Sequence, residues 1–244
     1  MKFILEVIGF SIEGCVIAQN AGANRIELCD NPHEGGTTPS YGFIKAAREQ
    51  LQIDLYPMIR PRGGDFIYSD DEFDIMKTDI NICKDLGCDG IVTGALINNG
   101  KVDKKRCSSL VRYAYPLGVT FHRAFDRTVD PFEALEDIIE IGCERILTSG
   151  QRPTATEGIS LIRELIETAG ERIIIMPGSG VKAENIIELA ERMNAVEFHT
   201  AARKIVPSQM DYKKQEMNEL LELISVDGDE VKKIIKQLSE LKGV

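Results

Sequence analysis

Eight short runs rich in aliphatic and β-branched residues alternate with amphipathic helical stretches, and this alternation constrains the fold more than any other feature of the sequence. A strand, a helix and a further strand in succession are typical of a parallel sheet with crossover helices. Eight such units are expected to close on themselves, so the sequence predicts a (β/α)8 (TIM) barrel of the α/β class. The predicted strands are 3–8, 25–29, 53–60, 90–93, 119–122, 145–148, 173–176 and 196–199, and the predicted helices include 43–51, 71–86, 131–141, 157–168 and 183–192.

A short motif recurs before the second, fourth and sixth predicted strands. Residues 21–26, 86–91 and 141–146 each combine a helix end, a glycine, a small residue and a strand start. Glycine suits this position because the chain takes a left-handed conformation there. The repeat indicates a unit of two βα modules, and it predicts that Cys88 and Cys143 are small packing residues. The cysteines that fall in helical stretches are interpreted in the same way: Cys15, Cys83 and Cys107.

The length of 244 residues suits one barrel, so we predict a single domain over 1–244, with a long polar loop at 200–228 before a final helix at 229–241. The formal net charge of −10 argues against binding to nucleic acid or to an anionic membrane. No apolar run is long enough to span a bilayer, and the first residues read as a strand rather than as a signal peptide. With six cysteines and no C-x-x-C pair, the protein is expected to be cytoplasmic with reduced thiols.

Several polar residues fall on strand positions that face the barrel interior, because side chains alternate along a strand between the interior and the helix layer. The ends of parallel barrel strands meet in one mouth, where site residues gather. A buried charge is costly unless it is paired, so we expect Arg60 to pair with Glu6 or Glu27. A structural network that ties the strands together is the alternative to a functional site. The candidate catalytic residues are Glu6, Glu27, Arg60, His122 and His199.

The loops that follow the strands carry groups that suit an anion. Arg62 precedes a pair of glycines, and the turn 178–180 follows the seventh strand, where many barrels bind phosphate. Backbone amides of a glycine turn and the start of the next helix can hold an anion, although a tight turn that needs a positive φ explains the same glycines. The candidate substrate-binding residues are Arg62, Arg123, Asp126, Ser149, Gly178, Ser179 and Gly180.

Several reaction classes are disfavoured by what the strand ends lack. No lysine ends a predicted strand, which argues against a Schiff-base aldolase. The chain has no G-x-S-x-G nucleophile motif, and it has neither an H-x-x-x-H nor a C-x-x-C pair, which argues against structural zinc.

Five segments together resemble the CutC family, and the likeness runs from residue 1 to about 203. The segments are Glu-Leu-Cys at 27–29, the run 34–40, Met-Ile-Arg-Pro-Arg-Gly-Gly-Asp-Phe at 58–66, Phe-His-Arg-Ala-Phe-Asp at 121–126 and Leu-Thr-Ser-Gly at 147–150. The resemblance implies a cytosolic barrel that forms a homo-oligomer, a dimer or a tetramer, and that serves copper homeostasis by binding Cu(I). Cys29 falls in the Glu-Leu-Cys motif, so the resemblance makes it the candidate copper thiolate.

Three functional hypotheses follow. Copper handling comes first, with Cys29 and Met58 as the sulfur-bearing residues predicted inside the barrel, since Cu(I) prefers soft ligands. The second is an enzyme that acts by acid/base chemistry on a small phosphorylated or carboxylate substrate, held by Arg60, Arg62 and the turn 178–180. The third is a non-catalytic scaffold. The expected partner is a copper ion or a small anionic molecule.

Overall fold

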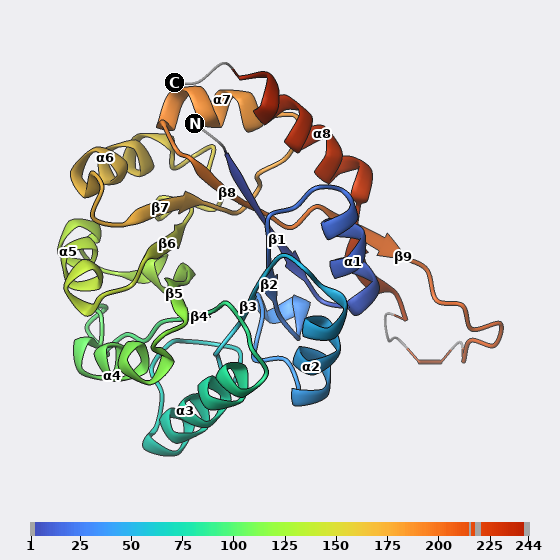
Figure 1. Ribbon diagram of the computed structural model, residues 1–244, viewed down its shortest axis with the longest axis horizontal. Coiled ribbons are helices and arrows are strands. Elements are labelled where there is room, and N and C mark those ends of the chain that lie inside the picture. Colours follow the sequence, from blue (N-terminus) through green and yellow to red (C-terminus); the bar gives the residue numbers. More distant parts are fainter. Residues whose placement is uncertain (1–2, 215, 218–220, 242–244) are drawn as a thin grey trace.

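The strands of the computed structural model form a closed parallel barrel with the helices arranged around its outside (Figure 1). The structure describes residues 3–214, 216–217 and 221–241. The strands pair in the orders β3-β2-β1-β8 and β4-β5-β6-β7, and a bridge between Met58 and Val92 joins the two sets. The predicted (β/α)8 barrel is confirmed. The barrel strands are β1 (Ile4–Gly9), β2 (Arg25–Leu28), β3 (Asp54–Pro57), β4 (Gly90–Thr93), β5 (Gly118–Phe121), β6 (Arg145–Thr148), β7 (Ile174–Pro177) and β8 (Glu197–Thr200).

Most of the helices begin after a residue whose side chain accepts a hydrogen bond from a free backbone amide, although α6 and α7 do not. Ser69 and Glu72 form a capping box at the start of α3, in which each side chain accepts from the other residue's backbone N–H. No helix in the described part of the chain is long and apolar enough to cross a membrane. The helices are α1 (Ile12–Asn20), α2 (Tyr41–Gln50), α3 (Asp70–Asp85), α4 (Lys104–Ala114), α5 (Pro131–Ile141), α6 (Ile159–Ala169), α7 (Ile186–Met193) and α8 (Gly228–Glu240).

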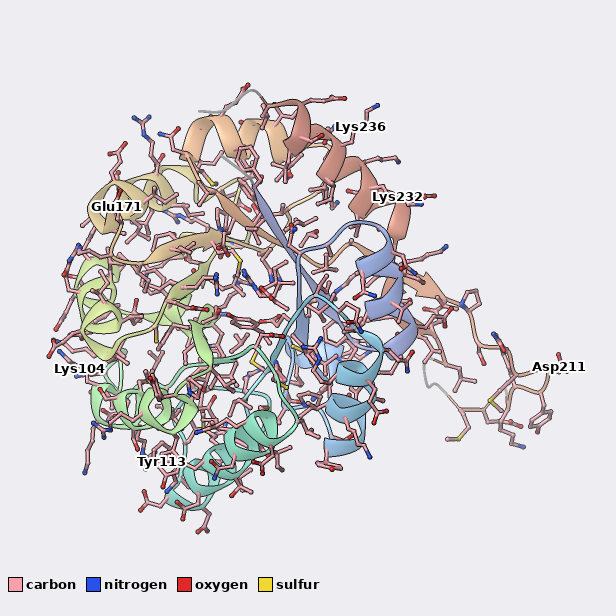
Figure 2. All side chains as sticks on the ribbon, viewed as in Figure 1. Lys104, Tyr113, Glu171, Asp211, Lys232 and Lys236 are labelled. Carbon is pink, nitrogen blue, oxygen red and sulfur yellow. The ribbon has the colours of Figure 1, made fainter. Side chains whose placement is uncertain are left out.

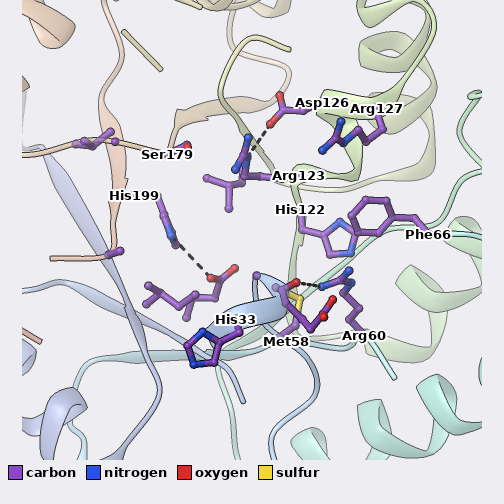
Figure 3. Close-up of a pocket in the computed structure, with 18 of the residues that line it drawn as sticks. His33, Met58, Arg60, Phe66, His122, Arg123, Asp126, Arg127, Ser179 and His199 are labelled. Atoms are coloured by element: carbon purple, nitrogen blue, oxygen red, sulfur yellow. Dashed lines mark hydrogen bonds and ion pairs between the residues drawn. The ribbon is translucent and has the colours of Figure 1, made fainter. Parts of the chain in front are cut away.

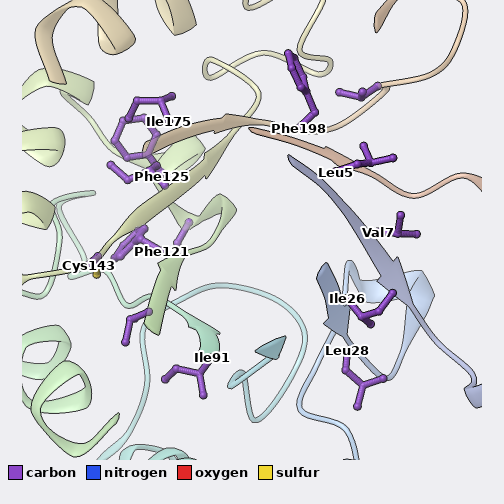
Figure 4. Close-up of a cluster of buried hydrophobic side chains, with 14 of the residues drawn as sticks. Leu5, Val7, Ile26, Leu28, Ile91, Phe121, Phe125, Cys143, Ile175 and Phe198 are labelled. Atoms are coloured by element: carbon purple, nitrogen blue, oxygen red, sulfur yellow. The ribbon is translucent and has the colours of Figure 1, made fainter. Parts of the chain in front are cut away.

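The main hydrophobic core lies between the strands and the helices. Figure 4 shows Leu5, Val7, Ile26 and Phe198 on β1, β2 and β8, and all four are fully buried. Charged side chains such as Lys104 and Lys232 point outward from the helices (Figure 2). The alternation of side chains along each strand therefore leaves the opposite set of residues inside the barrel, where the polar residues lie.

The pairing register of β1 decides which polar residues meet inside. Glu6 lies opposite Arg25 on β2 and opposite His199 on β8. Arg25, Arg145 and Glu197 are each the first residue of their strand. The interior polar residues thus form a layer at the strand starts, with Glu6 and His199 leading from it toward the strand ends.

The segment after β8 differs from the predicted loop at 200–228. It contains two antiparallel strands, β9 (Arg203–Val206) and β10 (Leu223–Val226), and Figure 1 shows β9 extending away from the barrel beside α1. The predicted loop at 200–228 thus contains a two-stranded antiparallel ladder, which its polar composition hid. Residues 215 and 218–220 of that prediction lie outside the described residues. The predicted final helix is present as α8.

Candidate functional site

A cavity of about 1240 Å³ opens at the carboxyl ends of the strands, and we call it the mouth cavity. Its walls combine strand-end residues with residues from the following loops, among them the short 3-10 helices η1 (Pro32–Glu34) and η2 (Arg123–Arg127). Figure 3 shows His199, His122 and Arg60 directed toward this space. The residues that line it include Glu27, His33, Met58, Arg60, His122, Arg123, Asp126, Arg127, Ser179, Gly180, Lys182 and His199.

An interior ion network lies deeper in the barrel and consists of Glu6, Arg25, Arg145 and Glu197. Arg25 donates to Glu6 through Nε and to Glu197 through Nη2, the latter at 2.6 Å. Arg145 Nε donates to the same Glu197 oxygen at 2.6 Å. All four side chains are buried, so each charge depends on the others for compensation. The sequence analysis missed both arginines, although Arg25 lies two residues before Glu27 and so shares its inward face.

His199 links this network to the mouth cavity. Its Nδ1 lies 2.8 Å from Glu6 Oε1, and its Nε2 lies 3.9 Å from Glu27 Oε2. Burial disfavours the charged imidazole, but the carboxylates of Glu27 and Glu6 outweigh burial and raise the pKa of His199. Burial likewise disfavours ionised Glu6, yet the Arg25 charge and the His199 contact hold the pKa of Glu6 at about 2. Glu6 is therefore a fixed negative charge beneath a histidine whose imidazolium form it helps to stabilise.

Glu27 has the opposite environment. Burial and the nearby Glu6 charge outweigh the attraction of His199 and raise the pKa of Glu27 to about 7. Its Oε1 atom is buried without a hydrogen-bond partner among the described residues. A carboxyl group that titrates near neutral pH and faces a cavity can give or take a proton there.

Glu6, Glu27 and His199 could also hold a metal ion, because one ligand atom from each lies within 4.8 Å of the others. Two carboxylates and an imidazole suit a hard or intermediate divalent cation better than Cu(I).

Cys29 lies next to this group, in a small buried cluster with Met58, Ile8, Tyr56 and Val92. Met58 reaches the wall of the mouth cavity, whereas the Cys29 thiol is fully buried behind it. Burial, and then the adjacent Glu27 carboxylate, raise the pKa of the Cys29 thiol well above its usual range. Without a bound metal, Cys29 is therefore a protonated thiol.

In the described part of the chain Arg60 does not pair with a carboxylate, which corrects the sequence-based expectation. Its guanidinium donates to the backbone carbonyls of Glu34 at 2.7 Å, Gly36 at 2.8 Å and Gly64 at 2.7 Å. The reason is its place at the mouth, where it reaches the loops rather than the strand starts. Arg60 thus holds two cavity loops together. The pairing with Glu6 that was expected of Arg60 is made by Arg25 instead.

His122 is buried at the mouth and packs against Phe66, with 4.9 Å between the ring centroids. Its Nδ1 accepts a hydrogen bond from the Ala124 N–H at 3.2 Å. Burial, together with the Arg60 charge, lowers the pKa of His122 to about 3, so the ring is neutral at physiological pH. His122 lines the same cavity as His199, but its pKa shifts in the opposite direction.

Arg62 does not line the mouth cavity, which corrects its predicted role beside Arg60. Its guanidinium donates to Glu72 Oε1 at 2.6 Å and to Asp65 Oδ1 at 3.1 Å. Asp65 follows the glycine pair and Glu72 lies on α3, and these two contacts turn the side chain away from the cavity. An anion in the cavity would therefore meet other cations.

Arg123, Asp126 and Ser149 form one hydrogen-bonded group. Arg123 donates to Asp126 Oδ2 at 2.7 Å and to Ser149 Oγ at 2.8 Å. Asp126 also accepts from the Ser149 backbone N–H at 3.1 Å. Arg123 and Asp126 line the cavity, whereas Ser149 is fully buried behind them.

The turn 178–180 reaches the cavity through its last two residues. The Gly178 amide donates to Thr148 O at 2.9 Å, so it is already used by the barrel. Ser179 and Gly180 have positive φ angles of 73° and 77° and line the cavity. Helix α7 begins several residues later, at Ile186, so its amino end does not add to this turn.

Comparison with known proteins gives a consistent result. The family model described as the CutC family matches residues 3–204. A protein of Chromobacterium violaceum named as a CutC family protein is 50% identical over 214 residues, which cover 88% of this chain and 87% of that protein. The human copper homeostasis protein cutC homolog is 48% identical over 211 residues, covering 86% of this chain and 77% of that protein. The crystal structure of CutC from Streptococcus agalactiae aligns with a TM-score of 0.78 at 36% identity, covering 81% of this chain and 98% of that one.

Proposed function

The chain belongs to the CutC family, and from this premise we propose that it serves copper homeostasis by binding Cu(I) at Cys29 and Met58, beside the mouth cavity. Relatives named for copper homeostasis support the role, and the positions of the two sulfur-bearing side chains support the site.

The observation that carries the proposal is that both side chains surround one point next to Gly36. A Cβ atom built on Gly36 would lie 2.9 Å from the Cys29 sulfur and 3.8 Å from the Met58 methyl carbon. Cu(I) prefers thiolate and thioether ligands, and these residues bring one of each from neighbouring strands. The other five cysteines lie in the helix-facing core, away from the cavity.

Charge favours a monovalent ion at Cys29. The buried thiol holds a proton, and exchange of that proton for Cu(I) leaves the net charge of the buried cluster unchanged. A divalent ion on the same sulfur would add a positive charge, and its compensation would require the ionised form of the adjacent Glu27. Glu27 hydrogen-bonds to the thiol and titrates near neutral pH, so it provides a path for the released proton to the cavity.

The test is a Cu(I) titration of the whole protein under reducing conditions, against a chromophoric Cu(I) chelator. Cys29→Ser should remove stoichiometric binding and Met58→Leu should weaken it. Cys143→Ser is the matched control, because Cys143 is also buried but lies under a helix end. Equal losses in the Cys29 and Cys143 variants, or a loss in neither, would contradict the assignment.

The Glu27–His199 pair favours a second function, namely acid/base catalysis on a small phosphorylated or carboxylate molecule. The Glu27 carboxyl titrates near neutral pH beside His199, and both residues face a cavity that Arg123, Arg127 and the turn at Ser179 also line. These cations and backbone amides would hold the anion, and Glu27 would move the proton.

Binding of phosphate or sugar phosphates to the metal-free protein tests this second function. A ligand of the folded state stabilises it by about 2.7 kcal/mol at one hundred times its dissociation constant. Arg127→Ala should abolish the resulting rise in melting temperature, whereas Arg62→Ala should keep it, because Arg62 points away from the cavity. A rise no larger than that caused by chloride at equal ionic strength would remove the support for an enzyme.

A cytoplasmic location and a dimeric or tetrameric state remain part of the proposal. Copper binding at Cys29 requires a reduced thiol, which is the state that the cytoplasm maintains. Cell fractionation and light scattering of the purified protein test these two expectations, and a monomer in solution would contradict the second.

A further inference from the structure

Helix α3 ends in a turn that brings two cysteines together, far from the mouth cavity. The Cys88 N–H donates to the Cys83 carbonyl at 3.0 Å, and the Gly87 N–H donates to the Lys84 carbonyl at 3.0 Å. Gly87 has a positive φ of 72°. These are the bonds of a Schellman motif, in which the side chains at the positions of Cys83 and Cys88 normally touch.

The same turn occurs at the ends of α1 and α5, where the recurring sequence motif places it. The Ala23 N–H donates to Ala18 O at 3.1 Å, and the Cys143 N–H donates to Ile138 O at 3.4 Å. One backbone geometry thus carries three side-chain pairs, namely Ala18–Ala23, Cys83–Cys88 and Ile138–Cys143. The thiol pair of the middle copy is not required by the turn, because alanines serve in the first copy.

The two thiols differ in character. The interaction with the Cys83 thiol, with help from the Arg48 charge, lowers the pKa of Cys88 despite burial. The same interaction, followed by burial, raises the pKa of Cys83. A thiol with a stabilised thiolate beside a second thiol is the arrangement of a nucleophilic and a resolving cysteine.

We propose that Cys83 and Cys88 are a redox-active dithiol that reacts with small disulfides. The Cys88 thiolate attacks one sulfur of the small disulfide, forms a mixed disulfide and releases one small thiol. Cys83 then loses its proton and attacks the Cys88 sulfur, which forms the Cys83–Cys88 bond and releases the second small thiol. The protein loses two electrons and two protons, and the small disulfide is reduced to two thiols.

The pair can be reached by a limited opening of the chain. Cys83 is fully buried and Cys88 is 5% exposed, but Gly87 and Asp89 on either side of Cys88 are exposed. A local opening of the turn therefore uncovers Cys88 first, which suits its role as the attacking thiol.

The experiment treats the folded, full-length protein with oxidised glutathione and maps the cysteines after tryptic digestion. Cleavage at Lys77, Lys84 and Lys101 separates Cys83, in peptide 78–84, from Cys88, in peptide 85–101. The expected product is these two peptides joined by a disulfide, with a loss of two free thiols out of six. Dithiothreitol should restore both thiols.

Internal controls come from the other two copies of the turn. Cys143 faces Ile138, so it should stay reduced under the same treatment. The double variant Cys83→Ala/Cys88→Ala copies the Ala18–Ala23 pair and should fold, melt like the wild type and lose no thiols. Oxidation of Cys143 to the same extent, a mixed disulfide that stays on Cys88, or a cross-link that forms only in denaturant would each overturn the proposal. Cys29 takes no part, so the outcome is independent of the copper titration.

Discussion

Arg25 compensates two buried carboxylates at once, and its replacement by methionine tests whether the interior ion network holds the barrel together. Arg25 contacts Glu6 and Glu197, while Arg145 keeps a second contact with Glu197. In Arg25→Met, Glu6 keeps only His199 as a counter-charge. Removal of one partner of a buried ion pair costs about 3–5 kcal/mol, because the remaining charge stays buried.

The pH dependence gives an independent figure for the same interaction. The pKa of Glu6 falls from 4.5 to about 2 in the folded protein. At about 1.4 kcal/mol per pH unit, ionised Glu6 adds about 3 kcal/mol to stability above pH 4.5. This contribution is lost as the pH falls from 4.5 toward 2, since the unfolded chain takes up the proton first. In Arg25→Met, the Arg25 charge no longer favours ionised Glu6, so the variant has less of this contribution to lose.

Urea denaturation between pH 7 and pH 3.5 measures both effects. Arg25→Met should be less stable than wild type by about 3–5 kcal/mol at pH 7, and the difference should shrink in acid. Arg172→Met is the matched control, because Arg172 pairs with Glu136 at the surface, where such pairs contribute about 1 kcal/mol or less. The reasoning is refuted if the two variants lose the same small amount at every pH.

Two further predictions concern the residues around the copper site. Burial raises the pKa of Glu27 from 4.5 to about 7, so the wild type should lose stability as the pH rises through that range. Glu27→Gln should therefore have a higher urea midpoint than the wild type at pH 8. A stability advantage of Glu27→Gln that is the same at pH 4.5 would contradict this. Gly36→Ala should weaken Cu(I) binding in the chelator titration, because its Cβ would lie 2.9 Å from the Cys29 sulfur. Gly35 also has a positive φ, 78°, but a Cβ atom built on it would meet nothing within 4 Å. Gly35→Ala should therefore share the backbone strain but keep the affinity for Cu(I).

The sequence predicted those parts of the fold and site that depend on the periodic alternation of side chains along each strand. The eight strands and the inward positions of Glu6, Glu27 and His199 follow from side-chain alternation, which a parallel barrel preserves. Arg25 obeys the same rule but was passed over because it stands first in its strand, where an arginine reads as an exposed flank. Only the closed register shows that the strand starts of β2, β6 and β8 meet around Glu197.

Loop residues were predicted less well because their contacts depend on the loop conformation, which side-chain periodicity in the sequence does not reveal. Arg60 and Arg62 are two residues apart, yet one donates to three carbonyls at the cavity and the other to Glu72 on α3. The Schellman turns show the reverse case. Their glycines were recognised from the sequence, and the contact between Cys83 and Cys88 follows from the geometry that those glycines allow.

The sequence left open whether the interior charges are a structural network or a functional site, and Glu6 shows that the two are joined. In such barrels the strand starts mainly carry stability and the strand ends carry chemistry. Glu6 binds Arg25 through one oxygen and His199 through the other, so the same carboxylate belongs to both layers. Its charge is fixed by Arg25, and that fixed charge in turn helps to raise the pKa of His199 beside Glu27. The ion network therefore sets the proton affinity of the groups that line the mouth cavity, and a substitution at Arg25 should change the titration of His199 as well as the stability of the barrel.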